Sequence, residues 1–261
     1  MGPSLSRPVA ARPTSSPTRT WPKASIRAAL REAVSAAGLQ MADLTDLPGA
    51  RVCAGLAGAR LPGMADAFAN RLPFPAQVVD DSVTALAGAL GGADGTLASL
   101  GTGSFFIRKA AGSIRHVGGW GAQLGDEGSA AWMGRRALSL SLRVADGRLP
   151  DDPLAQALIA ATPPHPVLFA RAASPGDFAQ LARLVLRHAD TPMAKRLIAD
   201  TCTALSDGVR DVGHRPGEAL VLTGGLGDLL RPHLPTELRA ACRPPLGRPL
   251  DGALSLARGL P

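Results

Sequence analysis

Three glycine-bracketed polar clusters lie within the 34 residues from Gly101 to Gly134. They read Gly-Thr-Gly-Ser at 101–104, Gly-Gly-Trp-Gly at 118–121 and Gly-Asp-Glu-Gly-Ser at 125–129. Glycine lets backbone N–H groups approach a ligand, because it has no side chain and tolerates positive φ. Hydroxyls, two carboxylates and one indole lie between these glycines. This combination suits an anionic, hydroxyl-rich ligand better than a core, and we expect the function to lie here.

A pair of carboxylates, Asp80 and Asp81, ends an apolar run and precedes a predicted helix. In open α/β sheets, ligands bind at the C-terminal ends of the strands, so a carboxylate at this place is directed into that crevice. One of the pair could act as a general base that takes a proton from an attacking hydroxyl. Alternatively, Asp81 or Ser82 only caps the following helix. The spacing alone leaves both interpretations open.

The parts of the glycine-rich stretch also have plainer explanations when each is taken alone. The motif at 101–104 could bind a phosphate or sugar, but a β-hairpin turn is the favoured interpretation of so short a run. Trp120 stands between glycines, where its ring can stack on a sugar. Asp126 and Glu127 precede a predicted helix, where carboxylates also stabilise the helix dipole. Because two such motifs are so close together, ligand binding is favoured over capping.

A further glycine-rich segment, Gly224–Gly227, follows a predicted strand and opens a helix, which is a common way to admit a nucleotide. It matches neither GxGxxG nor GxxxxGK[ST], so it predicts neither a Rossmann nor a P-loop site. The five histidines lack HxxxH or HExxH spacing, and we predict no histidine-bound metal. The three cysteines form no CxxC pair and are expected to be buried, reduced thiols: Cys53, Cys202 and Cys242.

Strands and helices are predicted around these motifs from hydrophobic periodicity and turn residues. The predicted strands are 51–55, 77–80, 97–101, 104–109, 114–117 and 219–223. The predicted helices are 24–37, 63–71, 82–90, 129–144, 153–161, 176–188, 192–212, 228–234 and 252–260. Residues 1–23 are rich in Pro, Ser, Thr and Arg and are predicted to be disordered. Mixed elements with polar loops at strand ends indicate an α/β or α+β protein with a cleft.

The formal net charge of +7 does not by itself predict nucleic-acid binding. The basic residues are 25 Arg and 3 Lys, they are scattered along the chain, and the absence of Tyr leaves little for base stacking. No apolar run approaches the roughly 18–20 residues that span a bilayer, and the first residues lack a signal-peptide core. We therefore expect a cytoplasmic protein without nucleic-acid or membrane partners.

Taken together and in order, several strings resemble the BadF/BadG/BcrA/BcrD-type ATPase family, in particular its glucosamine and N-acetylglucosamine kinase branch. They are VVDDSVTALAGAL, SLGTGS, GGWGAQLGDEGSAAWMGRRAL, VLTGGL and PLDGALSLARG. The resemblance runs from about Ala24 to the end. It implies an α/β, actin-like ATPase fold with two ribonuclease-H-like lobes around a cleft for ATP, Mg²⁺ and a sugar. The implied first lobe is 24–94 with 249–261, and the second is 95–248.

The resemblance also implies roles for individual residues. Asp81 matches the family's catalytic base, which acts on the sugar 6-hydroxyl. The positions that match sugar-binding residues are Ser104, Gly119, Trp120 and Asp126. The positions that match the loops near ATP are Gly101, Thr102, Gly103, Gly224 and Gly225. Family members also open with a DGGGT-like phosphate loop that has no counterpart in this sequence, so the first lobe is expected to be incomplete at its N-terminus.

The implied function is ATP-dependent phosphorylation of the 6-hydroxyl of glucosamine or N-acetylglucosamine, with activity impaired by the missing phosphate loop. One alternative is an ATPase activator of a 2-hydroxyacyl-CoA dehydratase. Such proteins hold an iron–sulfur cluster through cysteines, but the three cysteines here do not lie in the expected stretch after the GTGS motif. A second alternative is a non-catalytic sugar-binding remnant. An amino sugar is the expected partner, and the oligomeric state, with a homodimer among the options, stays open.

Overall fold

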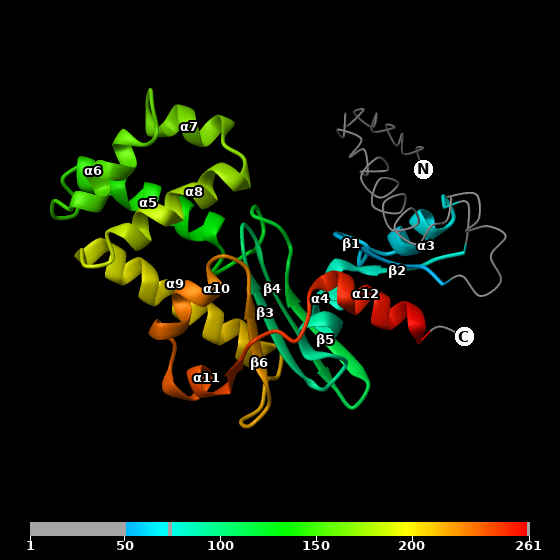
Figure 1. The fold of residues 1–261 in the computed structure, drawn as a ribbon. Helices are drawn as coiled ribbons and strands as arrows, with labels where there is room; N and C mark the ends of the chain where they lie inside the picture. Colours follow the sequence, from blue (N-terminus) through cyan, green and yellow to red (C-terminus); the bar gives the residue numbers. More distant parts are fainter. Residues whose placement is uncertain (1–50, 73–74, 260–261) are drawn as a thin grey trace, which may run out of the picture. The chain divides into compact units, whose positions relative to one another are not determined.

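The computed structural model describes residues 51–72 and 75–259 (Figure 1). These residues belong to one compact unit that begins at Arg51. The predicted disordered segment 1–23 and the predicted helix 24–37 lie outside the described residues. The α/β class expected from the sequence is confirmed, because strands of two sheets are interspersed with helices along the described chain. The lobe boundaries at 94/95 and 248/249 stay a prediction.

A short parallel pair of strands begins the described chain. Strand β1 (Cys53–Leu56) pairs with β2 (Gln77–Asp80), and Leu56 lies opposite Asp80. Helix α3 (Met64–Ala69) lies between them in the chain and buries Phe68. Helix α4 (Asp81–Leu90) follows β2 with no residue between them. The carboxylate pair therefore stands where the predicted strand passes directly into the predicted helix.

The second sheet has five strands, both parallel and antiparallel, in the order β5-β4-β3-β6-β7. Its strands are β3 (Gly95–Leu100), β4 (Ser104–Ala110), β5 (Ser113–Gly118), β6 (Leu220–Thr223) and β7 (Cys242–Arg243). The first three form an antiparallel meander, whereas β6 runs parallel to β3 and β7 runs parallel to β6. Because β3 and β6 are parallel neighbours, the loops that begin at Gly101 and Gly224 leave the same edge of the sheet.

The two faces of this sheet pack against different helices, because successive strand residues point to opposite sides. Leu97, Ile107 and Val221 share a buried cluster with residues of α4. Leu100 and Phe106 belong to a larger buried cluster on the other face, together with residues of the helices that follow β5. Helix α4 contacts strands of both sheets.

Most of the remaining helices lie between β5 and β6, and Figure 1 shows them in green to yellow. They are α5 (Ala130–Ala145), α6 (Pro153–Ala160), α7 (Pro166–Ala172), α8 (Pro175–Arg187) and α9 (Pro192–Asp211). After β6 follow α10 (Gly227–Leu230), the 3₁₀ turn η1 (Arg231–His233), α11 (Thr236–Ala241) and α12 (Pro249–Arg258). The sequence did not predict α7, α11 or β7, because each is too short to show a periodic pattern. The other described elements are confirmed within a few residues.

Helix α12 crosses α4 with backbone against backbone. A Cβ atom added to Gly252 would overlap the carbonyl oxygen of Thr84, and one added to Gly88 would overlap the carbonyl oxygen of Arg248. Only glycine permits such an approach, because any side chain at either position would hold the helices apart. The crossing fixes the C-terminal helix against the helix that carries Asp81.

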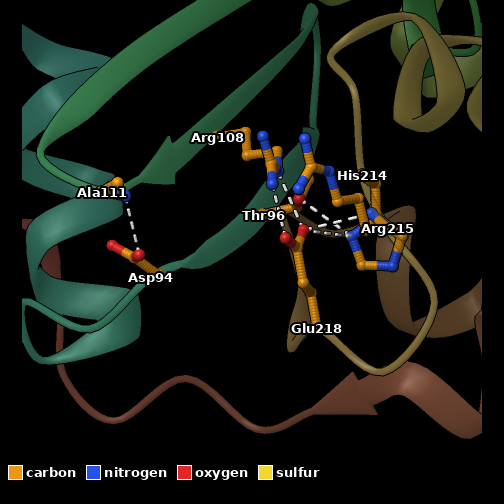
Figure 2. Close-up of polar contacts among 7 residues, drawn as sticks. All are labelled: Asp94, Thr96, Arg108, Ala111, His214, Arg215 and Glu218. Atoms are coloured by element: carbon orange, nitrogen blue, oxygen red, sulfur yellow. Dashed lines mark hydrogen bonds and ion pairs between the residues drawn. The ribbon is translucent and has the colours of Figure 1, made fainter.

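A polar network lies where β3 and β6 begin, at the end of the sheet opposite the glycine-rich loops that follow these strands. Figure 2 shows the residues of this network. Arg108 on β4 makes two hydrogen bonds to the Glu218 carboxylate, one of them from Nε to Oε2 at 2.8 Å. His214 lies 2.9 Å from the hydroxyl of buried Thr96 and 3.9 Å from Glu218. The Arg108 guanidinium lowers the pKa of Glu218 to about 2. The network joins the start of β3, strand β4 and the turn before β6.

Candidate active site

Asp80 and Asp81 have different environments at the junction of β2 and α4. Asp80 is the N-cap residue of α4, and its Oδ1 accepts hydrogen bonds from the backbone N–H of Ser82 at 3.3 Å and from the Ser82 hydroxyl. Its Oδ2 accepts the backbone N–H of Arg60 at 3.3 Å. The expectation that Asp81 or Ser82 caps this helix is therefore wrong, because the extended backbone of Asp80 places its own carboxylate over the first turn.

Asp81 is the first residue of α4 and is exposed to solvent. The surrounding protein nevertheless partly desolvates its carboxylate, and the neighbouring Asp80 carboxylate adds negative charge, so the pKa of Asp81 is raised from 3.8. The backbone amide of Ser82 opposes this shift. A carboxylate with a raised pKa is a stronger base than an ordinary aspartate while it stays ionised near neutral pH.

The glycine turn at 101–104 joins β3 to β4 as a hairpin, as its sequence favoured when taken alone. The N–H of Gly101 donates to the carbonyl of Gly103 at 2.9 Å. The first turn of α5 donates back to this loop, from Ala130 to Gly101 at 2.9 Å and from Ala131 to Thr102 at 3.2 Å. A Cβ added to Gly101 meets no atom within 4 Å, so this side of the turn faces open space.

Asp126 is buried directly behind the glycine turn. It has a positive φ of 61°, which is uncommon for a residue with a side chain. Its Oδ1 accepts the N–H of Gly121 at 3.2 Å, and a Cβ added to Gly103 would lie 2.7 Å from its Oδ2. Burial and the nearby Glu127 raise the pKa of Asp126, and the amides of Ser104 and Gly121 lower it. Gly103 therefore leaves room for a carboxylate that is held in an unusual conformation.

The cap of α5 is Ser129, whose hydroxyl oxygen accepts the N–H of Trp132 at 3.1 Å. The side-chain cap of α5 is therefore Ser129 and neither Asp126 nor Glu127, so the alternative explanation that these carboxylates cap the helix is wrong. Ser104 is buried, and its hydroxyl donates to the carbonyl oxygen of Glu127 at 2.7 Å. This bond ties the start of β4 to the Gly-Asp-Glu-Gly loop.

Trp120 follows β5 and is 62% exposed, which is unusual for a side chain of its size. The guanidinium carbon of Arg60 lies 4.4 Å from the centre of the indole ring. The same guanidinium donates a hydrogen bond to the carbonyl oxygen of Gly118 at 3.0 Å. Gly119, between these two residues, is also exposed. One face of an exposed indole is thus supported by a cation.

The second glycine loop, at 224–227, lies against the first. Gly224 has a φ of 85°, and a Cβ at this position would overlap the carbonyl oxygen of Leu100 at the end of β3. That carbonyl accepts the N–H of Leu226 at 3.0 Å. Gly225 faces open space, since an added Cβ would meet no atom within 4 Å. The structure therefore brings both glycine loops to one edge of the sheet, as the strand order requires.

Two residues that the sequence analysis did not assign to the site connect its parts. His116 on β5 places its Nε2 3.2 Å from the hydroxyl of Ser82 on α4, and burial and Arg60 lower the pKa of its imidazole. Arg60 contacts Asp80, Gly118 and Trp120 as described above. No local motif could reveal these contacts, because they join residues up to 60 positions apart in the sequence.

The cysteines do not favour the iron–sulfur alternative. Cys202 and Cys242 are buried and Cys53 is half-buried. Burial raises the pKa of all three thiols, that of Cys202 to about 11, whereas cluster ligation requires thiolates. Within residues 51–72 and 75–259, no three His, Cys, Asp or Glu side chains gather as a metal site would require.

No helix in the described part of the chain combines the length and apolarity needed to span a bilayer.

Comparisons with known proteins give a consistent result. The family model of the BadF/BadG/BcrA/BcrD ATPase family matches residues 9–230. The glucosamine kinase GspK of Vibrio cholerae is 28% identical over 220 residues, which cover 81% of this chain and 74% of that protein.

Two solved structures are also similar. A candidate N-acetylglucosamine kinase from Chromobacterium violaceum is 33% identical, with a TM-score of 0.77 over 89% of this chain and 83% of that one. A candidate N-acetylglucosamine kinase from Porphyromonas gingivalis is 22% identical, with a TM-score of 0.54 over 78% of this chain and 74% of that one. The second match bears on the fold alone.

Proposed function

This chain belongs to the BadF/BadG/BcrA/BcrD ATPase family and has the actin-like α/β fold expected from its sequence, and on that premise we propose that it is an ATP-dependent amino-sugar kinase. The relatives named above as kinases of glucosamine and N-acetylglucosamine support this proposal. We further propose that the phosphate is transferred to the 6-hydroxyl of one of these two sugars.

The observation that carries the proposal is the division of roles between Asp80 and Asp81. Asp80 caps α4, whereas Asp81 is exposed at the C-terminal end of β2, and partial desolvation and the neighbouring Asp80 raise the pKa of its carboxyl group. Ligands of open α/β sheets bind at this end of the strands. A general base for an attacking hydroxyl needs these properties.

In the proposed reaction, the Asp81 carboxylate accepts the proton of the sugar hydroxyl as the oxygen attacks the γ-phosphorus of ATP. A new bond forms between the sugar oxygen and the γ-phosphorus, and the bond to the β,γ-bridging oxygen breaks, so that ADP leaves. Phosphoryl transfer depends chiefly on positioning and electrostatic stabilisation. Asp81 therefore has to orient the hydroxyl as well as remove its proton.

The sugar is proposed to lie against Trp120 and Gly119, near Ser104 and Asp126. The exposed indole offers an apolar face to the sugar ring, and the Asp126 carboxylate is a hydrogen-bond acceptor for sugar hydroxyls. Ser104 is proposed to act through the loop that its hydroxyl holds, because that hydroxyl is already bonded to Glu127. This placement predicts that sugar binding depends on both aromatic stacking and a buried carboxylate.

The nucleotide fits the two glycine loops. Gly101 and Gly225 face open space, so a phosphate or an adenosine can approach their backbone closely, and Thr102 adds an exposed hydroxyl. Gly103 and Gly224 shape these loops through their close contacts with Asp126 and Leu100. We assign these five residues to ATP binding.

Mg²⁺ is proposed to accompany ATP, where it would neutralise charge on the phosphates. Carboxylate oxygens are suitable Mg²⁺ ligands, and Asp80 and Asp81 are the carboxylates at the proposed reaction centre. Mg²⁺ commonly uses only one or two protein carboxylates together with substrate phosphates, so the donors present fit a nucleotide-borne ion. We assign no residue as a dedicated metal ligand.

We also propose that the 261-residue chain transfers phosphate less efficiently than relatives with a DGGGT-like phosphate loop, because this sequence contains no such run. Adding a segment with that loop to the N-terminus should then raise kcat. An extended protein with the same kcat as the 261-residue chain would contradict this part of the proposal. A cytoplasmic location, where ATP is available, and a homodimer stay predictions.

The kinase proposal is tested with a panel of glucosamine, N-acetylglucosamine, N-acetylmannosamine and glucose, incubated with ATP and Mg²⁺. Phosphorus–proton correlation NMR then identifies the phosphorylated position of each product. We expect phosphate on the 6-hydroxyl of at least one of the two glucosamine-type sugars. If neither the 261-residue protein nor the extended protein transfers phosphate to any sugar of the panel, the kinase function is refuted.

A further inference from the structure

Arg60 lies in the segment between β1 and α3 and makes contacts in two directions. Its backbone N–H donates to Oδ2 of Asp80 at 3.3 Å, at the start of the helix that carries Asp81. Its side chain extends to the loop after β5, where it donates to the carbonyl oxygen of Gly118 and covers the ring of Trp120. A single residue thus connects the proposed base region with the proposed sugar platform.

The indole of Trp120 packs near Gly125 and is otherwise largely open to solvent. It is 62% exposed, and it stands between Gly119 and Gly121, whose φ angles are 71° and 86°. A backbone with glycine on both sides of a residue has unusual conformational freedom. A guanidinium 4.4 Å from the ring centre attracts the electron-rich face of the indole and limits its rotation.

We propose that Arg60 is a positioning residue that holds Trp120 in place for stacking on the sugar. This inference rests on the proposed sugar-kinase function. The guanidinium occupies one face of the indole, so the sugar stacks on the opposite face. Because the backbone of Arg60 is bonded to Asp80, the platform keeps a fixed relation to the neighbouring Asp81.

A second connection supports this relation independently. His116 on β5 lies 3.2 Å from the hydroxyl of Ser82, and that hydroxyl donates to Oδ1 of Asp80. The Asp80 carboxylate is therefore hydrogen-bonded through both oxygens: Oδ1 accepts from Ser82, and Oδ2 accepts from Arg60. Asp80 is the point where both connections from the β5 region reach the start of α4.

The test uses a protein in which Trp120 is the only tryptophan, with the substitutions Trp21→Phe and Trp132→Phe. Into it are introduced Arg60→Leu, which removes the side-chain contacts but keeps the backbone bond to Asp80, and Arg60→Lys, which keeps the charge. Arg136→Leu is the control: in the native protein Arg136 covers Trp132 at 4.6 Å, so in this background the substitution removes a guanidinium beside the ring at position 132 and leaves the contact between Arg60 and Trp120 in place. If Arg60→Leu does not fold, as judged by circular dichroism, Arg60→Gln replaces it.

Two quantities are measured: acrylamide quenching of Trp120 fluorescence without sugar, and calorimetric Kd values for glucosamine and N-acetylglucosamine. We expect Arg60→Leu to increase the quenching and to weaken the tighter-binding sugar by about fivefold, the loss expected for one partly exposed cation–π contact. Arg60→Lys should recover part of both changes, and Arg136→Leu should alter neither.

The positioning role is overturned if Arg60→Leu leaves the quenching unchanged, or if quenching increases while sugar affinity stays the same. Failure of the parent protein to bind either sugar contradicts the proposed function instead. The two failures are distinguishable, because the quenching measurement requires no sugar.

Discussion

Neighbouring carboxylates acquire different properties here because the backbone assigns them different positions. Asp80 is extended and caps a helix, whereas Asp81 is the first helical residue and keeps an exposed carboxylate with a raised pKa. The residue pattern alone left open whether one of the pair is a general base or Asp81 or Ser82 only caps the helix, and the family resemblance indicated Asp81 as the base. The capping role of Asp80 depends on its backbone angles and on a hydrogen bond from Arg60, which lies 20 positions earlier in the sequence.

The raised pKa of Asp81 predicts a pH dependence for the kinase. Because protonated Asp81 cannot accept a proton, kcat/KM falls as the pH falls through the pKa of Asp81, which lies above the ordinary value of 3.8. Asp80→Asn keeps a good helix cap but removes the adjacent negative charge. The acid limb of the profile should therefore lie at lower pH in Asp80→Asn than in the wild type.

The control for this profile is Asp151→Asn, which changes an exposed carboxylate before α6 and should leave the acid limb in place. Phosphate transfer is followed with radiolabelled ATP from pH 4 to 8. An acid limb at the same pH in Asp80→Asn and in the wild type would show that Asp80 does not tune the base.

The close contact between Gly103 and Asp126 gives a second prediction at this scale. In Gly103→Ala the new Cβ would lie 2.7 Å from Oδ2 of Asp126, so the carboxylate must move. We expect the Kd of the amino sugar to rise about tenfold, since a displaced carboxylate would lose a hydrogen bond to the sugar worth about 1–2 kcal/mol. Calorimetry measures the Kd, with Gly176→Ala on α8 as a control that meets only an ordinary contact. Equal sugar affinity of Gly103→Ala and Gly176→Ala would contradict the assignment of Asp126 to the sugar site.

At the scale of elements, the order of strands and helices was largely predictable, and their spatial relations were not. The strand that ends at Asp80 and the hairpin at Gly101 follow from local residue types. The proximity of Gly224 to Leu100 follows from the parallel pairing of β6 with β3, which no local pattern specifies. The contact between His116 and Ser82 is likewise tertiary. The missed elements are short, so hydrophobic periodicity could not indicate them.

The crossing of α12 and α4 predicts a large effect of a small substitution. Gly252→Ala places a methyl group against the backbone of α4, which should lower the free energy of unfolding by about 3 kcal/mol, at the upper end for overpacking. Urea denaturation measures the change. Ser255→Ala, at an exposed position of the same helix, should stay within about 0.5 kcal/mol. Similar stabilities of the two variants would show that the helices can separate at little cost.

At the scale of the whole molecule, stability and the proposed chemistry depend on opposite ends of the five-stranded sheet. The glycine loops follow β3 and β6. At the other end of the sheet, Arg108 on β4 binds Glu218 in the turn before β6, and His214 in the same turn contacts Thr96 of β3 (Figure 2). Substitutions in this network should therefore change stability without altering the geometry of the loops. The network was not apparent from the sequence, because Arg108 and Glu218 are 110 positions apart.

Glu218 predicts a pH dependence of stability. Its pKa is lowered from 4.5 to about 2 in the folded protein, so the unfolded chain binds more protons between these values. The stabilisation is complete above about pH 4.5 and is lost as the pH falls toward 2. In Glu218→Gln we expect about 2 kcal/mol less stability at pH 7 and a smaller loss on acidification.

Urea denaturation at pH 7, 5 and 3 measures both effects. Asp207→Asn is the control, because it disrupts an exposed ion pair with Arg210 and should change stability little. A Glu218→Gln variant that is as stable as the wild type at pH 7 would contradict the assigned role of the network.

The most direct test of the kinase function compares phosphate transfer by the wild type and by Asp81→Asn, using radiolabelled ATP and whichever amino sugar binds. Asparagine keeps the size of the side chain but cannot accept the proton, so transfer should fall at least about 100-fold. The Kd of the sugar should change by less than about twofold, because the amide oxygen of asparagine can still accept a hydrogen bond from the sugar hydroxyl. Equal transfer rates for the two proteins would contradict the assignment of Asp81 as the base.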